Sequence, residues 1–366
     1  MLSAFLIAFV AVIVVNIAFY VLLGNYSFAK IATVQKAAMP VSVIICAKNE
    51  ADKLRVILPK MFSQNYPNFE VIVVNDASSD NTSELLKEFS KAHPQLQIVE
   101  VQNNEAFWAN KKYALTLGIK KAKNNILLFT DPNTLPISNE WIATLAGQFN
   151  AQKQLLLGHI CIPKNFGFWN VLMRFDNCNR SLFNFSLAKA GLPFSSNGKN
   201  LGYTAELFYA HRGFMSHMNI RAGEDELFIN EAATGKNTAV CDHPNAFIRL
   251  QQLPLNKKDW IAHKKRRLLI FGHLKSGYQF LAGLHFFAKL AFWVLAMLSF
   301  IFVEWRLAIL LIVSNFVFQY LFVFKGYSKL KEKELLYYLI RLEIVHLWVQ
   351  ISIFISNNFS RPKLWK

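Results

Sequence analysis

The feature that most constrains this chain is the pair of long apolar stretches near its two ends. No side chain is charged from Met1 to Leu23, and a second hydrophobic block begins near Phe280. A run of about 20 apolar residues is long enough to cross a bilayer as a helix. Hydrophobic residues make up 53% of the 366 residues, a fraction that is unusual for a wholly soluble protein. We therefore expect membrane helices on both sides of a central domain.

Residues 1–28 are predicted to be a membrane anchor rather than a cleaved signal peptide. Their start has no Lys or Arg, and no clear small-residue cleavage site follows them. Lys30 and Lys36 come after the apolar stretch. Because basic residues favour the cytoplasmic side of a membrane, the N-terminus is expected outside and the central domain in the cytoplasm.

The C-terminal block, residues 279–356, divides into three hydrophobic segments. Residues 280–303 and 307–324 are separated by only three residues, which predicts a tight hairpin of two spans. The third segment, 335–355, contains an arginine, a glutamate and a histidine, and a basic tail follows it at 357–366. A third full crossing would place that tail outside, so an interfacial or re-entrant helix is favoured for this segment.

Residues 40–275 alternate between strand-like and helix-like patterns. Strand–helix alternation with fully apolar strands implies an α/β fold with a mostly parallel sheet covered on both faces. Ligands of such folds bind beyond the carboxyl ends of the strands. An aromatic-rich stretch at 183–194 is interpreted as a loop that faces the membrane or an acceptor. The predicted strands are 41–47, 69–76, 97–101 and 125–130, and the predicted helices are 51–63, 79–89 and 108–122.

Polar side chains follow three of these strands at one edge of the predicted sheet. Lys48 and Glu50 follow the first strand, Asn75 and Asp76 end the second, and Asp131 ends the fourth. Each is also an ordinary turn or cap residue, but turns alone need not favour one edge. Their convergence predicts a binding cleft. No Gly-rich phosphate loop follows the first strand, which argues against an ATPase or a dinucleotide enzyme.

The chain is strongly basic, with a formal net charge of +17. Such a charge is typical of a membrane protein with positive cytoplasmic loops or of a cleft for an anionic substrate, and nucleic acid is a weaker alternative. The four cysteines are far apart and form no C-x-x-C pair, so a zinc site or a disulfide framework is not expected.

Several motifs, taken in order, resemble those of family 2 glycosyltransferases. The resemblance covers about residues 40–275, and it is the order of the motifs that makes it specific, since each alone is weak. VIVVNDASSDNT corresponds to the family's V-D-D-G-S-x-D-x-T core, and TDPN to its D-x-D strand end. The motifs are VSVIICAKNEADKL (41–54), VIVVNDASSDNT (71–82), ANKKYALTLGI (109–119), ILLFTDPNTLPISNEWI (126–142), SNGKNLGYTAELF (196–208), AGEDEL (222–227) and WIAHKKRR (260–267).

The resemblance implies a GT-A fold, with a Rossmann-like sheet, and transfer of a sugar with inversion from a UDP- or GDP-sugar donor. Asp225 is then the candidate general base, and Glu224 would orient it. These two acids also suit the first turn of a helix, where its dipole favours negative charge. The residues assigned to the donor nucleotide are Lys48, Glu50, Asn75, Asp76, Lys111 and Asp131.

The same resemblance implies a divalent cation, Mg²⁺ or Mn²⁺, bridged between Asp131 and the donor diphosphate. Asn133 stands where the family has the second Asp of D-x-D, and it offers a carbonyl oxygen but no negative charge. His243 is a lesser candidate ligand, since an ordinary turn histidine is more common. Weak metal affinity is therefore expected.

The WIAHKKRR segment is assigned to the diphosphate and acceptor side through Trp260, His263, Arg266 and Arg267. A basic cluster next to a membrane also suits anionic lipid, so this segment is expected to serve either role or both. His263 replaces the family's usual Gln, and Arg267 stands where many members have Trp, which argues against processive synthesis.

The sequence thus predicts a membrane-anchored inverting glycosyltransferase in the inner membrane of a bacterium, with its catalytic domain facing the cytoplasm. Its acceptor would be lipid-linked or a saccharide, in the synthesis of cell-surface polysaccharide or glycolipid, and the bilayer rather than nucleic acid is its expected partner. Two alternatives stay open. One is a polyprenyl-phosphate hexose transferase, and the other is an inactive glycosyltransferase-like scaffold, for which Asn133 is the best support.

Overall fold

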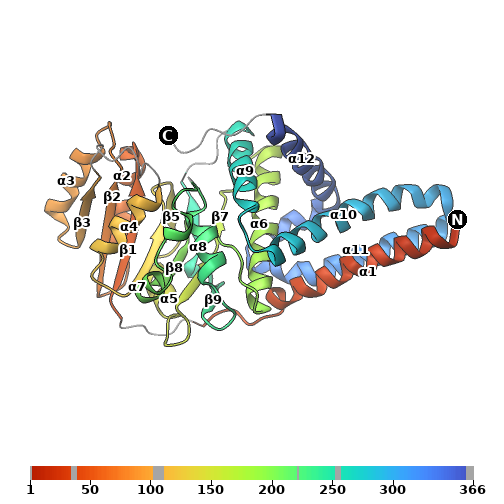
Figure 1. Cartoon of the computed structure of the whole chain (residues 1–366), viewed down its shortest axis with the longest axis horizontal. Helices are drawn as coiled ribbons and strands as arrows, with labels where there is room; N and C mark the ends of the chain where they lie inside the picture. The colour runs from red at the N-terminus through yellow and green to blue at the C-terminus, as the bar shows by residue number, and fades with distance from the viewer. Residues whose placement is uncertain (1, 34–38, 102–110, 221, 252–256, 360–366) are drawn as a thin grey trace.

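The computed structural model describes residues 2–33, 39–101, 111–220, 222–251 and 257–359. An α/β domain forms one end of the molecule and a bundle of long helices forms the other (Figure 1). The first helix, α1 (Leu2–Ser27), lies in the bundle beside helices from the other end of the chain. Lys36, residues 108–110 of a predicted helix and the basic residues of the predicted tail after position 359 lie outside the described residues.

The α/β domain is built on a seven-stranded sheet with the order β3-β2-β1-β4-β8-β6-β9. The first four strands in this order are parallel, β8 runs antiparallel to both of its neighbours, and β9 is parallel to β6. The mostly parallel sheet expected from the sequence is confirmed. These strands are β1 (Val41–Ala47), β2 (Phe69–Asn75), β3 (Leu96–Glu100), β4 (Ile126–Thr130), β6 (Leu155–Gly158), β8 (Leu201–Thr204) and β9 (Thr238–Cys241).

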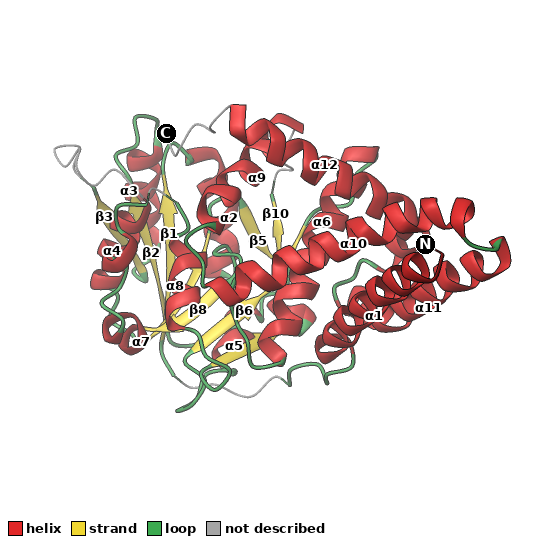
Figure 2. Ribbon diagram, turned by 45° about the vertical axis from the view of Figure 1, so that its right-hand side comes forward, coloured by secondary structure: helices red, strands yellow, loops and turns green. Residues whose placement is uncertain are grey.

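A second, three-stranded sheet with the order β5-β10-β7 lies beside the carboxyl end of β4. Helices cover both faces of the main sheet, as Figure 2 shows. The strands of the small sheet are β5 (Thr134–Pro136), β7 (Ile160–Cys161) and β10 (Ile248–Leu250). The domain's helices are α2 (Ala51–Phe62), α3 (Thr82–Ala92), α4 (Lys111–Lys121), α5 (Trp141–Ala146), α6 (Phe168–Lys189), α7 (Ala205–Ala210), α8 (Glu224–Ala232) and α9 (Lys257–Phe271).

Alternation along the central strands divides the core into two layers. Val43 and Ile45 of β1 pack into one hydrophobic cluster, while Ile44 and Cys46 pack into the other on the opposite face. Successive side chains of a strand point to opposite faces, so a strand buried on both sides reads as a continuous apolar run. This is the reason that β1, β2 and β4 could be predicted to within one residue.

Four helices of the described chain are long and apolar enough to cross a membrane: Ser3–Ser27, Ser276–Phe302, Trp305–Lys329 and Lys333–Asn357. The second and third are α10 (Ser276–Phe302) and α11 (Trp305–Lys329), and they form the predicted hairpin. Glu304 accepts hydrogen bonds from the backbone N–H groups of Arg306 and Leu307, at 2.9 and 3.2 Å, and so caps the start of α11.

The last helix, α12 (Leu339–Phe359), follows the short 3₁₀ turn η4 (Lys333–Tyr338) and differs in placement from the other three. It contacts α6 and α9 and is inclined to the α1–α10–α11 bundle (Figure 1). Its length and composition are those of a spanning helix. The interfacial or re-entrant position expected for 335–355 therefore stays a prediction.

The loop expected at 183–194 is wrong for most of its length. Residues 183–189 are the last two turns of α6, a helix of 22 residues. Phe175, Cys178, Leu182 and Phe185 are buried along one side of it at spacings of three and four. The helical spacing of these buried residues is a better signal of structure than the aromatic enrichment of the segment.

Candidate active site

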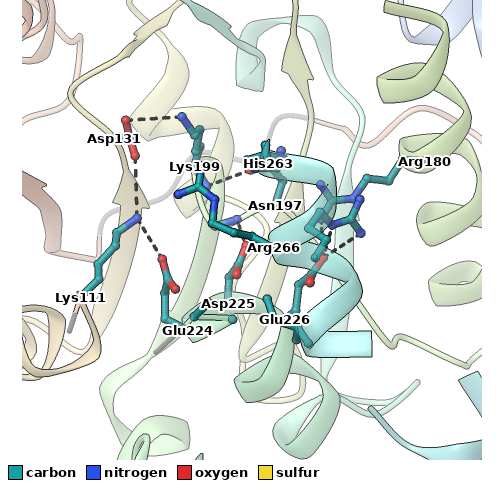
Figure 3. A pocket seen from close by; sticks show the side chains of 15 residues that line it. Lys111, Asp131, Arg180, Asn197, Lys199, Glu224, Asp225, Glu226, His263 and Arg266 are labelled. Atoms are coloured by element: carbon teal, nitrogen blue, oxygen red, sulfur yellow. Dashed lines mark hydrogen bonds and ion pairs between the residues drawn. The ribbon is translucent and has the colours of Figure 1, made fainter. Parts of the chain in front are cut away.

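A pocket of about 230 Å³ opens beyond the carboxyl end of β4, where the predicted polar residues meet (Figure 3). Its walls come from the start of α8, the loop before β8, α9 and the middle of α6. This is the edge of the sheet at which α/β folds bind their ligands. The polar side chains that line it are Lys111, Asp131, Arg180, Asn197, Lys199, Glu224, Asp225, Glu226, His263, Arg266 and Arg267.

Asp131, directly after β4, lies between two lysines. Its Oδ1 accepts a hydrogen bond from the backbone N–H of Asn133 at 3.1 Å and lies 3.5 Å from Lys199 Nζ. Its Oδ2 lies 3.8 Å from Lys111 Nζ. Burial alone would raise the pKa of Asp131, but the charges of Lys199 and Lys111 outweigh it and lower the pKa to about 2. The carboxylate is therefore ionised throughout the physiological range.

Glu224, the first residue of α8, is joined to the same network. One of its carboxylate oxygens lies 3.0 Å from Lys111 Nζ, so that Lys111 at the start of α4 bridges Glu224 and Asp131 (Figure 3). Burial opposes the charge of Glu224, yet Lys111 outweighs it and lowers the pKa of the carboxyl. Glu224 is therefore a fixed negative charge beside its neighbour Asp225.

Asp225 has the opposite electrostatic character. Burial, together with the negative charges of Glu224 and Glu226, raises the pKa of Asp225 to about 6. Its Oδ2 accepts a hydrogen bond from the backbone N–H of Gly198. A Cβ at Gly198 would lie only 2.8 Å from the Asp225 Cβ, so the glycine allows this close approach. A carboxylate with this pKa is ionised at pH 7 and is suited to accept a proton.

Glu226 is shared by two arginines on the side of the pocket away from Asp131. Its Oε1 lies 2.6 Å from Arg180 on α6 and 2.8 Å from Arg267 on α9. His263 also lies on this side, and burial together with the charges of the two arginines lowers its pKa well below the ordinary value. A neutral His263 and two guanidiniums that share one carboxylate give this wall an excess of positive charge.

Most of the predicted chemical residues are brought together here. Asp225, Glu224, Lys111, Asp131, His263, Arg266 and Arg267 all line the pocket. Arg180, Asn197 and Lys199 also line it, and the sequence reasoning did not single them out. Lys199 lies inside the SNGKNLGYTAELF motif, so its place in that motif was an available signal. Arg180 lies in no motif and reaches the site only through the packing of α6.

The predicted nucleoside residues lie next to this pocket, at the ends of β1 and β2. Lys48 Nζ lies 4.0 Å from an oxygen of Asp76, and both are partly exposed. Glu50 forms an ion pair with Lys53 one turn along α2. Because β1 pairs with both β2 and β4, Lys48 and Glu50 lie one strand away from Asp131, and Asp76 lies two strands away.

Asn75 needs a correction, because its side chain is turned into the domain. It is 1% exposed, and its Nδ2 donates hydrogen bonds of 2.7 Å to Ser83 and to Glu100. A buried amide with these partners is satisfied by the fold. Asn75 thus holds α3 and β3 in place behind Asp76 and does not face the cleft.

Two further assignments are not supported by the geometry. Trp260 is 6% exposed, packs against Trp169 and does not line the pocket. His243 Nδ1 accepts a hydrogen bond from the backbone N–H of Asn245, which caps the short turn η3 (Pro244–Ala246) after β9. β9 lies three strand positions from β4, or about 14 Å at the usual strand spacing, so His243 cannot share a metal ion with Asp131.

The residues around Asp131 fit a cation that is held partly by substrate. Within the described residues no group of three or more His, Cys, Asp and Glu side chains could hold a metal ion. Mg²⁺ in nucleotide sites commonly uses one or two carboxylates together with substrate phosphates. Asp131 is such a carboxylate, and in this structure its charge is balanced by Lys111 and Lys199.

Comparison with known proteins identifies relatives of part of this chain. Residues 42–216 match the family described as Glycosyl transferase family 2. The chain is 34% identical over 95 residues to a poly-beta-1,6-N-acetyl-D-glucosamine synthase of Staphylococcus epidermidis, which is 26% of this chain and 22% of the relative. It is also 34% identical over 114 residues to a 4,4'-diaponeurosporenoate glycosyltransferase of Staphylococcus haemolyticus, 31% of this chain and 29% of the relative. The chain thus spans less than a third of the length of these two relatives.

The fold has a close counterpart among solved structures. The mannosyltransferase PcManGT of Pyrobaculum calidifontis, solved in complex with GDP-Man and Mn²⁺, aligns over 95% of this chain and 99% of its own, with a TM-score of 0.59 and 18% sequence identity. At this identity the similarity concerns the fold. Residues 42–216 therefore match a family 2 glycosyltransferase domain, and the fold of the chain is GT-A.

Proposed function

We propose that this glycosyltransferase transfers a sugar, with inversion, from a nucleotide diphosphate donor to an acceptor associated with the membrane. The observation that carries this proposal is Asp225. It is a carboxylate with a raised pKa, held by the Gly198 N–H between an acidic network at Asp131 and an arginine wall. That arrangement offers a base, a cation site and an anion site within one pocket.

The donor is proposed to lie along the strand ends. Lys48 and Asp76 would contact the nucleoside, beside the pocket. The diphosphate would lie between Asp131 and the cations Lys199 and Arg266, with Mn²⁺ or Mg²⁺ held by Asp131. The ion would neutralise charge that develops on the leaving diphosphate. Buried cations placed where negative charge develops contribute to the rate in the same way.

Asp225 would accept the proton of the acceptor hydroxyl as its oxygen attacks the anomeric carbon. The bond from the sugar to the diphosphate breaks on the opposite face, which inverts the configuration. Glu224, held ionised by Lys111, keeps the pKa of Asp225 high, so the base is strong enough to take the proton. The negative charge of Glu224 also attracts the Lys111 ammonium. Together with Asp131 it holds Lys111 inside the pocket.

The acceptor is proposed to be lipid-linked or a saccharide at a membrane surface. Four apolar helices adjoin the catalytic domain, and one relative is named as a polysaccharide synthase. We infer that α1, α10 and α11 anchor the chain in the inner membrane of a bacterium, with the domain in the cytoplasm. Lys30 after α1 supports this orientation. Transfer of a hexose to polyprenyl phosphate remains the second candidate, favoured by the arginine wall.

An inactive scaffold is disfavoured because the chemical residues are intact. Asp76, Asp131 and Asp225 are all present, and the last two line one pocket with Lys111 and Glu224. Asn133 is the departure from the family pattern. Its backbone N–H donates a hydrogen bond to Asp131, a contact that an Asp at this position would keep.

The experiment that tests this function is a donor screen with the purified protein. Radiolabelled UDP- and GDP-sugars are supplied with Mn²⁺ and with native membranes as the acceptor source. We expect transfer of label by the wild type and a loss of at least about 100-fold in Asp225→Asn, because a positioned base contributes about 10² to 10⁴. Glu206→Gln, an exposed acid at the start of α7, is the matched control and should keep full activity. Nucleotide binding without turnover of any donor would establish the scaffold instead.

A further inference from the structure

A second cavity, of about 200 Å³, lies between the catalytic domain and the apolar helices. It is lined by residues of α1, α6, α9, α10, α11 and α12. Arg180 and Arg267 line both this cavity and the active-site pocket. The two spaces therefore lie on opposite sides of one arginine wall, and a molecule in the second cavity would be next to the catalytic groups.

Three helices each turn one face to this cavity, and the faces are amphiphilic. Lining residues spaced three or four apart lie on the same side of a helix. The polar lining residues lie near the catalytic domain and at the Lys289–Glu343 ion pair between the apolar helices. Apolar side chains line the rest of the cavity. The lining residues in question are Asp176, Asn179, Arg180 and Phe183 of α6, Ala282, Phe286 and Lys289 of α10, and Leu339, Glu343, His346, Leu347 and Gln350 of α12.

Charged groups occur inside helices that are otherwise apolar. Lys289 Nζ of α10 lies 3.5 Å from Glu343 of α12, and Gln319 of α11 donates a hydrogen bond to the same carboxylate. Nearer the domain, Asp176 pairs with Lys264 and lies 2.8 Å from His346 Nε2. Ionisable residues in membrane segments are costly and usually mark a functional path.

Several polar atoms that line the cavity lack a hydrogen-bond partner. Among the described side chains, Gln319 Oε1, His285 Nδ1 and Arg180 Nε are buried with none. Gln319 is only 2% exposed, so its side chain lies away from the protein surface. Because buried polar groups are nearly always hydrogen-bonded, these atoms indicate a polar guest in the cavity.

The charge of the shared wall indicates the sign of that guest. Glu226 forms ion pairs with both Arg180 and Arg267, so one negative charge faces two positive ones. Lys264 and Lys289, the other cations of the cavity, each pair with one acid. The cavity thus carries an excess positive charge at its catalytic end, and a planar guanidinium suits a phosphate especially well.

We propose that the second cavity binds the phosphate head of a lipid acceptor. The phosphate is bound at the Arg180–Arg267 wall, and the hydrocarbon chain lies against Ala282, Phe286 and Leu347 between α10 and α12. Where a substituent on the phosphate carries the acceptor hydroxyl, that hydroxyl then reaches Asp225 from the acceptor side. This inference rests on the proposed function, and it narrows the acceptor to a lipid that carries a phosphate. A soluble oligosaccharide would meet apolar walls on these same helices.

The test measures binding, so that it does not depend on turnover. Full-length protein in nanodiscs is titrated with radiolabelled farnesyl phosphate and with farnesol, which has the same chain without the phosphate. We expect farnesyl phosphate to bind at least tenfold more tightly. Ala282→Trp fills the cavity from α10 and should weaken that binding at least tenfold, with Ala282→Phe intermediate. Leu284→Trp, two residues away on the same helix and 37% exposed, is the matched control and should bind as the wild type does.

Every outcome decides the proposal. Binding of a nucleoside diphosphate, unchanged in all variants, shows that the domain is folded. Equal affinity for farnesol and farnesyl phosphate would overturn recognition of phosphate, and unchanged binding in Ala282→Trp would overturn the cavity. If inorganic phosphate at equal concentration displaces farnesyl phosphate, the Arg180–Arg267 wall binds a free anion and the proposal of a lipid is overturned. If farnesyl phosphate binds but no sugar is ever transferred, the proposed function fails while the lipid site stands. If sugar is transferred but farnesyl phosphate does not bind, the lipid site fails while the proposed function stands.

Discussion

At the scale of single residues, the chemistry depends on how three adjacent acids are separated electrostatically. Glu224 pairs with Lys111, Glu226 pairs with two arginines, and Asp225 between them receives no side-chain ion pair within the described residues. The pKa of Asp225 is raised by burial and by its two neighbours, while the pKa values of those neighbours are lowered by their cations. Divergent pKa values among adjacent acids are a mark of assigned catalytic roles.

A pH prediction follows from that pKa. A general base must be deprotonated, so a raised pKa moves the acid limb of the rate profile upward. We expect kcat/KM to fall tenfold for each pH unit below about 6, the pKa of Asp225, rather than below the usual value for Asp of about 4. The measurement is the initial rate between pH 4.5 and 8 in the full chain. Glu224→Gln removes a negative neighbour and should shift this limb to lower pH, whereas an unshifted limb would mean that another group titrates.

The Asp-Pro-Asn turn supports a second prediction. Asp131→Asn should lower activity at least about 100-fold, because it removes the carboxylate proposed for the cation. Asn133→Asp should instead bind Mn²⁺ more tightly, because a second acid joins Asp131. The readouts are initial rates over a Mn²⁺ series after chelation, and Mn²⁺ binding followed by electron paramagnetic resonance in the presence of a nucleoside diphosphate. Wild-type behaviour in both variants would place the cation elsewhere.

The part of the site that lies at strand ends could be predicted from sequence, and the part supplied by packing could not. Asp131 directly follows the apolar run of β4, so the sequence alone places it at the carboxyl edge of the sheet. Arg180 lies in the middle of a 22-residue helix, and only the position of α6 against α8 and α9 brings it to Glu226. Asn75 was misassigned because a residue at a strand end can face either the cleft or the neighbouring strand, and the pattern does not distinguish them.

At the scale of elements, close helix–sheet packing depends on one small residue. A Cβ at Gly118 of α4 would lie 2.8 Å from Val74 Cγ2 and 3.0 Å from Ile44 Cγ2, both in the main sheet. We expect Gly118→Ala to destabilise the domain by about 1 to 3 kcal/mol through overpacking. Gly272→Ala, with open space around the new methyl group, is the control and should change stability little. Thermal unfolding of the two variants in the same detergent compares them, and equal melting temperatures would show that α4 can shift at no cost.

The elements most readily predicted from sequence are those whose residues are apolar on every face. Strands β1, β2 and β4 are buried on both faces, and α1, α10 and α11 are apolar nearly all round, so period and length identified them. The two- and three-residue strands of the small sheet carry too few positions to show a period. Helix α6 has one side in the core and polar residues on the other, and its aromatic residues obscured the helical spacing.

At the scale of the whole molecule, the domain is joined to the apolar helices by buried ion pairs. Arg174 of α6 donates a hydrogen bond of 3.0 Å from Nε to Glu332, next to η4, and also pairs with Glu334. The Arg174 and Glu332 side chains are each 6% exposed. Breaking a buried pair from one side leaves an uncompensated charge, which costs about 3 to 5 kcal/mol.

We therefore expect Arg174→Met to lower the melting temperature of the full chain clearly. The double variant Arg174→Met with Glu332→Gln should recover much of that loss, since no charge is then left buried. Arg306→Met removes an exposed arginine near the far end of the hairpin and serves as the control. Differential scanning fluorimetry in nanodiscs makes the comparison. If the double variant were no more stable than Arg174→Met, the loss would come from packing rather than from the unpaired carboxylate.

The position of α1 has a consequence for the biogenesis of the protein. Its neighbours α10 and α11 are synthesised roughly 250 residues later, which at about 5 to 20 residues per second is a delay of some tens of seconds. During that time Asn16, whose amide donates to the Ala288 carbonyl in the finished structure, has no partner from α10. On the proposed membrane topology, the first helix is therefore alone in the bilayer while the catalytic domain folds on the cytoplasmic side.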